Sequence, residues 1–135
     1  TMKTNLPVTQ NEYVLREGVL IVTRTDPKGL ITYANSDFIE TSGFAEAELI
    51  GQPHNIIRHP DMPPQAFAQM WSDLKAGRTW TGIVKNRRKD GGFYWVVANV
   101  SPVRENGQIV GYQSVRGRPG REEIVAAATG ARKAA

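Results

Sequence analysis

Two tight-turn signals in the second half of the chain leave few choices for its fold. Residues 90–92 (Asp-Gly-Gly) and 105–107 (Glu-Asn-Gly) separate three stretches rich in β-branched and aromatic residues, at 80–88, 93–103 and 108–118. Asp-Gly and Asn-Gly are the strongest short-range signals for a β-hairpin. Three strands joined by two hairpins form an antiparallel meander, so this half of the chain is predicted to be most of an antiparallel sheet.

The beginning of the chain predicts one shorter hairpin. The apolar runs 19–22 and 30–33 flank Asp-Pro-Lys-Gly at 26–29. This tetrapeptide has proline and glycine at the positions where a type I turn favours them. Two further strands are therefore expected before residue 34.

Helices are expected between this hairpin and the meander. Asn35 or Ser36 can cap a short helix that Gly43 ends, and 45–50 forms another. The segment 52–64 contains four prolines and both histidines, and is expected to be irregular but restrained. A longer helix follows, because apolar side chains recur three and four residues apart at Phe67, Met70, Trp71 and Leu74.

The predicted order β-β-α-α-α-β-β-β gives an α+β fold, with one five-stranded antiparallel sheet and short helices on one face. The 135 residues fit one domain. We expect an N-terminal arm or cap at 1–17, the domain itself at 18–118, and the start of a linker at 119–135. A helix is expected to begin at 121–128, followed by a loose end at 130–135.

Composition excludes several function classes. The chain has no cysteine, which excludes disulfides, thiolate metal ligands and a cysteine nucleophile. No apolar run approaches the ~18–20 residues that cross a bilayer, and no secretory signal opens the chain, so a cytoplasmic domain is expected. The formal net charge is +4, and the basic run 85–89 is interpreted as the solvated end of a hairpin rather than a nucleic-acid patch.

Several motifs resemble those of a known family. The segments 33–35 (Tyr-Ala-Asn), 42–44 (Ser-Gly-Phe) and 48–51 (Glu-Leu-Ile-Gly) are similar to motifs of PAS domains. Two longer segments, 51–64 (containing Arg-His-Pro-Asp-Met-Pro) and 82–89 (Gly-Ile-Val-Lys-Asn-Arg-Arg-Lys), resemble the N-terminal PAS domain of bacterial aerotaxis receptors. The resemblance implies the PAS fold, non-covalent binding of FAD, and sensing of oxygen or redox state without catalysis.

The same resemblance implies the partners of such a domain. It would be the input module of a methyl-accepting chemotaxis type receptor and act on the downstream signalling domain of that receptor and, through it, on a chemotaxis histidine kinase. A homodimer through the PAS domain or the N-terminal cap is expected. A membrane would be reached only through regions outside this chain, and no nucleic acid is expected.

Candidate residues for the phosphate and adenosine end of FAD lie mostly in the proline-rich segment. Arg58 has a planar fork suited to phosphate, His59 can donate from a ring nitrogen, and Asp61 can accept from a ribose hydroxyl or adenine. Asp61 has a second interpretation, as a partner of Arg58 or as a helix cap. Asn35 is either a cap alone or also a contact to the adenosine end.

The flavin ring needs a flat apolar slot with hydrogen bonds to its polar edge. Phe67, Met70 and Trp71 are candidates for the slot, although such a helical stripe is also typical of an ordinary core. Trp80 resembles a tryptophan at the matching strand position of flavin-binding PAS domains. Asn86 shares a strand face with Trp80, and its amide would bond either to the ring or to a neighbouring turn.

Other positions are expected to have no direct part in the site. Trp95 has the opposite strand parity from its neighbours and is expected to face outward or toward a partner, and His54 is interpreted as structural. In the photosensing LOV branch of the family, a second asparagine and a glutamine contact the flavin, and the matching positions here are Val96 and Arg116. Without cysteine, the adduct photochemistry of that branch is excluded.

Three other functions remain open. A haem-binding gas sensor needs a histidine ligand, and the helix at 65–76 has none, although His54 and His59 precede it. A ligand-free PAS module that only dimerises would leave the candidate residues in an ordinary core. A flavin oxidoreductase ranks last, because there is no dinucleotide-binding glycine fingerprint.

Overall fold

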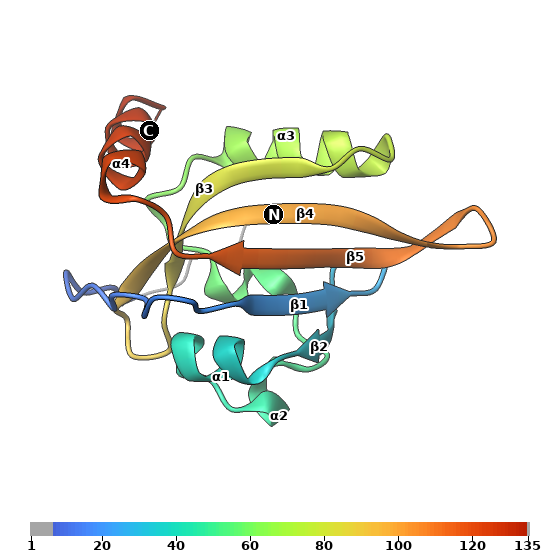
Figure 1. Cartoon of the computed structure of the whole chain (residues 1–135), viewed down its shortest axis with the longest axis horizontal. Helices are drawn as coiled ribbons and strands as arrows, with labels where there is room; N and C mark the ends of the chain where they lie inside the picture. The colour runs from blue at the N-terminus through green and yellow to red at the C-terminus, as the bar shows by residue number, and fades with distance from the viewer. Residues whose placement is uncertain (1–6, 135) are drawn as a thin grey trace.

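The computed structural model describes residues 7–134, with side chains up to residue 127. Its centre is one five-stranded antiparallel sheet with the strand order β2-β1-β5-β4-β3. The strands are β1 (Ile21–Thr25), β2 (Ile31–Ala34), β3 (Trp80–Arg87), β4 (Phe93–Glu105) and β5 (Gln108–Gly117). Figure 1 shows them running beside one another from β3 to β2. The predicted α+β class and sheet are confirmed.

Both hairpins of the meander form at the predicted turns. Arg87 pairs with Phe93 across the first, and Glu105 pairs with Gln108 across the second. Asn106 and Gly107 have φ values of 51° and 79°, the left-handed conformation that a tight hairpin turn requires. The predicted strand limits differ from the observed ones by at most three residues, as expected for ends that fray.

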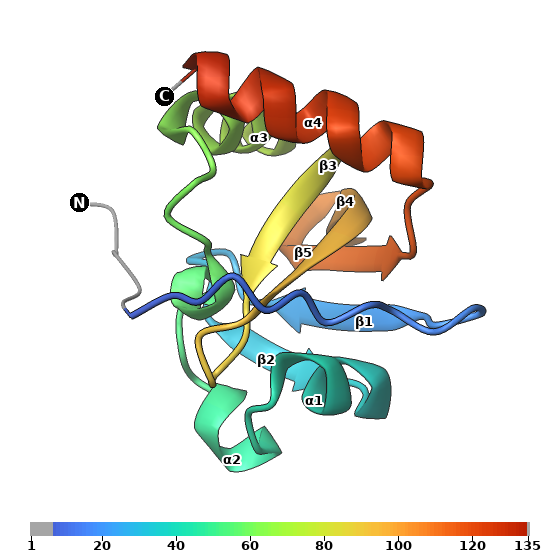
Figure 2. The same cartoon turned by 90° about the vertical axis from the view of Figure 1, so that its left-hand side faces the viewer.

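The helices α1 (Ser36–Ser42), α2 (Glu46–Leu49) and α3 (Pro64–Lys75) also lie where the sequence predicts them. Asn35 caps α1, since its Oδ1 accepts from the backbone N–H of Phe38 at 3.0 Å. A 3₁₀ turn, η1 (His54–Ile57), interrupts the proline-rich segment. Figures 1 and 2 show α1 and α2 beside β2 at one edge of the sheet and α3 beside β3 at the other.

The last helix, α4 (Arg121–Ala134), is longer than predicted. The sequence predicted helix at 121–128 and a loose linker from residue 130, whereas the helix continues to Ala134. The many alanines around Gly130 favour helix strongly enough to outweigh one glycine. In residues 7–134, no helix is long and apolar enough to cross a membrane.

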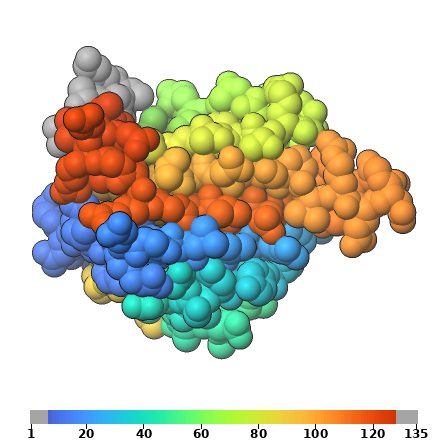
Figure 3. Space-filling view, viewed as in Figure 1, coloured from blue at the N-terminus to red at the C-terminus, as the bar shows by residue number. Residues whose placement is uncertain are grey.

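The N-terminal segment and α4 cover the sheet face opposite to α3. Backbone N–H groups of Thr9 and Tyr13 donate to Gly91 at 2.8 Å and Phe93 at 2.7 Å, so this segment runs along the first hairpin. Trp95 faces outward as its parity predicts, but it is only 6% exposed, because the N-terminal segment and α4 enclose it. Figure 3 shows the two segments adjoining at one end of the molecule. Residues 1–6 of the predicted arm lie outside the described residues, and the domain limits at 17 and 119 stay predictions.

Candidate functional site

A cavity of about 280 Å³ lies between the inner face of strands β3–β5 and the η1–α3 side of the molecule. This volume is just below the ~300–1,000 Å³ typical of small-molecule sites. Its apolar wall comprises Ile57, Phe67, Met70, Trp71, Trp80, Val84, Ala98 and Val100. Its polar wall comprises Lys28, His54, Asn55, Arg58, Asn86, Ser114 and Arg116. The cavity therefore combines aromatic surfaces with a small set of polar groups.

Strand register places the smallest residues of β3 and β4 in one row beneath the cavity wall. Alternate residues of β3 from Trp80 to Asn86 face inward. Gly82 is opposite Ala98 on β4, which is in turn opposite Arg116 on β5. One row of the sheet thus has no side chain at Gly82, which gives room to the Trp80 indole, and only a methyl group at Ala98, which lines the cavity.

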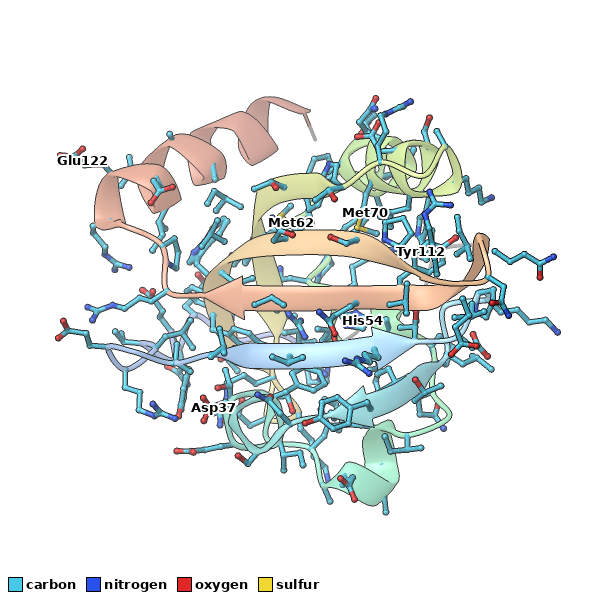
Figure 4. All side chains as sticks on the ribbon, turned by 45° about the vertical axis from the view of Figure 1, so that its right-hand side comes forward. Asp37, His54, Met62, Met70, Tyr112 and Glu122 are labelled. Carbon is cyan, nitrogen blue, oxygen red and sulfur yellow. The ribbon has the colours of Figure 1, made fainter. Side chains whose placement is uncertain are left out.

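Trp80 and Trp71 form two aromatic walls. A Cβ placed on Gly82 would lie 2.6 Å from Cη2 and 2.7 Å from Cζ2 of Trp80, so the indole lies directly across this glycine. The ring of Trp71 meets that of Tyr112 edge to face, with 5.3 Å between centroids. Met70, Tyr112 and His54, labelled in Figure 4, line a smaller hollow of about 70 Å³ that shares part of its wall with the cavity.

Arg58 and Phe67 lie together on the helix side. The guanidinium carbon of Arg58 is 4.2 Å from the centroid of the Phe67 ring, a cation–π contact. Burial lowers the pKa of Arg58 from its ordinary value, but an arginine so far from neutral pH keeps its charge. The structure therefore brings a half-buried cation to the cavity wall, as predicted.

Asn86 also lies where the sequence predicts it. It is 4% exposed and lines the cavity, and its Nδ2 has no hydrogen-bond partner among the described residues. Leaving a buried donor unpaired costs about 1–3 kcal/mol. A ligand with an acceptor at this point would remove that cost.

Arg116 is a functional candidate that sequence reasoning did not select. It is 3% exposed, and one of its Nη atoms donates to Thr23 Oγ1 at 3.1 Å. The guanidinium carbon is 4.7 Å from the centroid of Phe38, while Nε has no partner among the described residues. The resemblance to the LOV branch had pointed to this position, which was interpreted as a departure from that branch and not as a site residue.

His54 lines the cavity too, although the sequence suggested only a structural role. Its Nε2 is 3.0 Å from Thr23 Oγ1, and its ring stacks on Phe38 at 6.1 Å between centroids. Burial, followed by the charge of Arg116, lowers the pKa of His54 to about 3. The imidazole is therefore neutral at physiological pH. It packs against Phe38 and Thr23, as a structural residue would, and it also lines the cavity.

Three predicted residues do not line the cavity. His59 is 2% exposed, and its Nδ1 accepts from the backbone N–H of Asp61 at 3.1 Å. Asp61 forms an ion pair with Lys85 at 2.7 Å and does not cap α3, whose N-cap is Pro63. Asn35 uses its side chain in the cap of α1 and in bonds to β1 and the residue before it. Cofactor contacts by these three stay predictions.

The fold and this cavity define a class of protein. A family model described as the PAS fold matches residues 31–116. That match covers more than half of the chain, which therefore belongs to the PAS family. Among solved structures, the dark state of the blue-light photoreceptor Aureochrome1 LOV has a TM-score of 0.73 and 20% identity, covering 84% of this chain and 85% of that one.

Within the family, the chain is similar to the aerotaxis receptor of Escherichia coli K12. The two are 51% identical over 119 residues, which are 88% of this chain and 24% of the receptor. It is also 29% identical to the nitrogen fixation regulatory protein of Klebsiella pneumoniae, over 67% of this chain and 18% of that protein. The chain thus spans about a quarter or less of these relatives' length, and the resemblance to aerotaxis receptors is confirmed.

Proposed function

We propose that the cavity binds a flavin non-covalently, as FAD, and that the chain is a sensor of oxygen or redox state that does no catalysis of its own. The observation that carries this proposal is the cavity beside Trp80 and Ala98, bordered by two donors that have no partner among the described residues, Asn86 Nδ2 and Arg116 Nε. A flavin ring is flat and presents carbonyl oxygens and ring nitrogens along one edge. The aromatic walls match its faces, and the donors match that edge.

The rest of FAD has to lie outside the cavity, because about 280 Å³ is too small for the whole molecule. Lys28 is exposed and Arg58 half-buried, and both line the cavity, so both are available to a pyrophosphate. This arrangement supports a dinucleotide with its ring inside and its phosphates toward solvent.

The test is to identify what the purified protein carries. We expect the two near-ultraviolet and blue absorption bands of oxidised flavin, and FAD rather than FMN in an acid-released extract. Arg58→Ala should retain less FAD, whereas Arg78→Ala, which removes an exposed arginine paired with Asp73, should retain as much as wild type. Asp61→Ala, measured beside them, decides whether Asp61 contacts the cofactor.

Two other outcomes would replace the proposal. A single intense Soret band would indicate haem, for which His54 is the histidine in the cavity wall, although its Nε2 already contacts Thr23. A colourless protein that cannot be reconstituted with FAD would indicate a ligand-free dimerisation module.

At the scale of the receptor, we propose that this domain is a cytoplasmic input module of an aerotaxis-type protein. The 51% identity to the E. coli receptor supports this. The domain would act as a homodimer on a downstream signalling domain and, through it, on a chemotaxis histidine kinase.

A further inference from the structure

Arg116 is a buried cation that no carboxylate neutralises among the residues the structure describes. Its guanidinium contacts two neutral groups, the hydroxyl of Thr23 at 3.1 Å and the ring face of Phe38 at 4.7 Å. Its Nε has no hydrogen-bond partner within residues 7–134. A buried charge without a counter-charge is costly, so this residue would be expected to destabilise the domain unless a ligand compensates it.

The neighbouring titratable groups do not supply the missing negative charge. Burial raises the pKa of Tyr94 on β4 to about 12, and burial with Arg116 lowers the pKa of His54 on η1 to about 3, so both are neutral at pH 7. The wall contains two further cations, Lys28 and Arg58, and no aspartate or glutamate among the described residues. The fixed charge of the cavity is therefore entirely positive.

We infer that Arg116 stabilises negative charge on the bound ring, so that the cavity holds reduced flavin more tightly than oxidised flavin. This inference rests on the flavin site proposed above. Reduction by dithionite, itself oxidised to sulfite, would add two electrons and one proton to a bound flavin, which would then carry one more negative charge than in the oxidised state. Arg116 would stabilise that additional charge and so favour the reduced state.

The strand position of Arg116 suits this role. It is opposite Ala98, which also lines the cavity, and hydrogen bonding to Thr23 and contact with Phe38 hold its guanidinium in place. Lys28 and Arg58 lie nearer to solvent, where their charges are screened more strongly. Arg116 should therefore dominate the preference for a charged ring.

The experiment measures the affinity of the apoprotein for oxidised FAD in air and for dithionite-reduced FAD without oxygen. Arg116→Gln and Arg116→Met should weaken the affinity for reduced FAD about tenfold more than the affinity for oxidised FAD, equivalent to a midpoint potential about 30 mV more negative for a two-electron couple. Arg116→Lys should keep most of the wild-type preference because it keeps the charge. Arg24→Gln, on the outward face of β1, is the matched control and should change neither affinity.

The inference is overturned if the Gln or Met variant has the wild-type potential, or if it loses both affinities equally, as a structural defect would cause. The Met variant protects the test against misfolding, because replacing a buried ion with an apolar side chain often preserves or raises stability. A wild type that binds FAD in neither state overturns the proposed function and this inference with it. Flavin binding by wild type with no effect of Arg116 removes only the inference.

Discussion

Gly82 has no side chain at the point where the indole of Trp80 crosses the sheet. Because the added Cβ would lie 2.6 Å from a rigid ring, Gly82→Ala has to displace Trp80 into the cavity or away from it. Overpacking of this kind costs about 1–3 kcal/mol. We expect the variant to unfold at lower urea and to bind FAD more weakly, as measured by denaturation and by flavin fluorescence titration.

Gly117→Ala is the matched control for this change. Gly117 also lies in a strand, and the nearest atom to its added Cβ is 4.0 Å away. It should behave as wild type in both measurements. If Gly82→Ala also matched wild type in stability and in FAD affinity, the Trp80 indole would not lie across Gly82 and would not form a wall of the cavity.

Strand alternation was sufficient to predict part of the site. Trp80 and Asn86 were placed on one face by their even spacing, and both line the cavity. Arg116 and Ser114 reach the same cavity from β5, through the register of β5 against β4. That register depends on the whole sheet, so local pattern could not show which β5 residues line the same cavity as Asn86.

His59 and Asp61 were predicted to contact the cofactor, but neither side chain lines the cavity. Their neighbours in sequence suggested a phosphate-binding loop, but the turns of the proline-rich segment direct His59 into the core and Asp61 toward Lys85. Proline restrains a loop without specifying which side chains point inward. The prolines of this segment therefore indicate a restrained backbone, whereas tertiary packing determines which of its side chains point inward.

At the scale of elements, the fold was largely predictable because its signals are local. Hairpin turns, the Asn35 cap and the periodicity of α3 each act within a few residues. The 3₁₀ turn η1 was missed, because it is a single turn among prolines with no periodic pattern. The burial of Trp95 beneath α4 was also missed, because it joins segments that are distant in the sequence.

The segment from η1 to α3 predicts how stability depends on pH. Burial lowers the pKa of His59 to about 4 and that of His54 to about 3, against an ordinary value of 6.5. Below pH 6.5 the unfolded chain binds protons that the folded chain does not, so the free energy of unfolding falls with decreasing pH. The loss between pH 8 and 5.5 should be about 1.4 kcal/mol for each histidine, measured by urea denaturation.

The chain contains only two histidines, so the double variant His54→Gln/His59→Gln removes both groups that titrate in this range. Its free energy of unfolding should be nearly constant from pH 8 to 5.5. If the free energy of unfolding of the double variant fell with pH as steeply as that of wild type, the two imidazoles would be solvated in the folded protein and not buried.

At the scale of the whole molecule, the cavity and the last helix lie on opposite faces of the same strands. Asn86 faces the cavity, whereas Lys85 and Trp95 face the side covered by the N-terminal segment and α4. A change in hydrogen bonding at Asn86 can therefore be transmitted across the sheet to α4, which packs on the opposite face. The contact between the N-terminal segment and α4 is then the place where a ligand's state would be passed on.

One bidentate ion pair joins these two segments. Arg121 donates from Nη1 and Nη2 to the carboxylate of Glu12 at 2.8 and 2.9 Å, and this contact lowers the pKa of Glu12. Beside it lies a hollow of about 270 Å³ bounded by both segments, so the packing around the pair is loose. The ion pair should therefore matter more for the position of α4 than for the stability of the domain.

We expect Glu12→Gln to speed amide hydrogen exchange in α4 while exchange in β3–β5 stays as in wild type, because only the attachment of the helix is weakened. Glu48→Gln is the control, since it breaks another exposed ion pair, with Lys89, that lies far from α4 in the sequence and does not contact Arg121. Exchanging the charges, with Glu12→Arg and Arg121→Glu together, should restore slow exchange in α4. Exchange by mass spectrometry that was unchanged in Glu12→Gln, or not restored by the charge exchange, would mean that apolar contacts through Ile124 hold α4 in place and that this ion pair does not attach it.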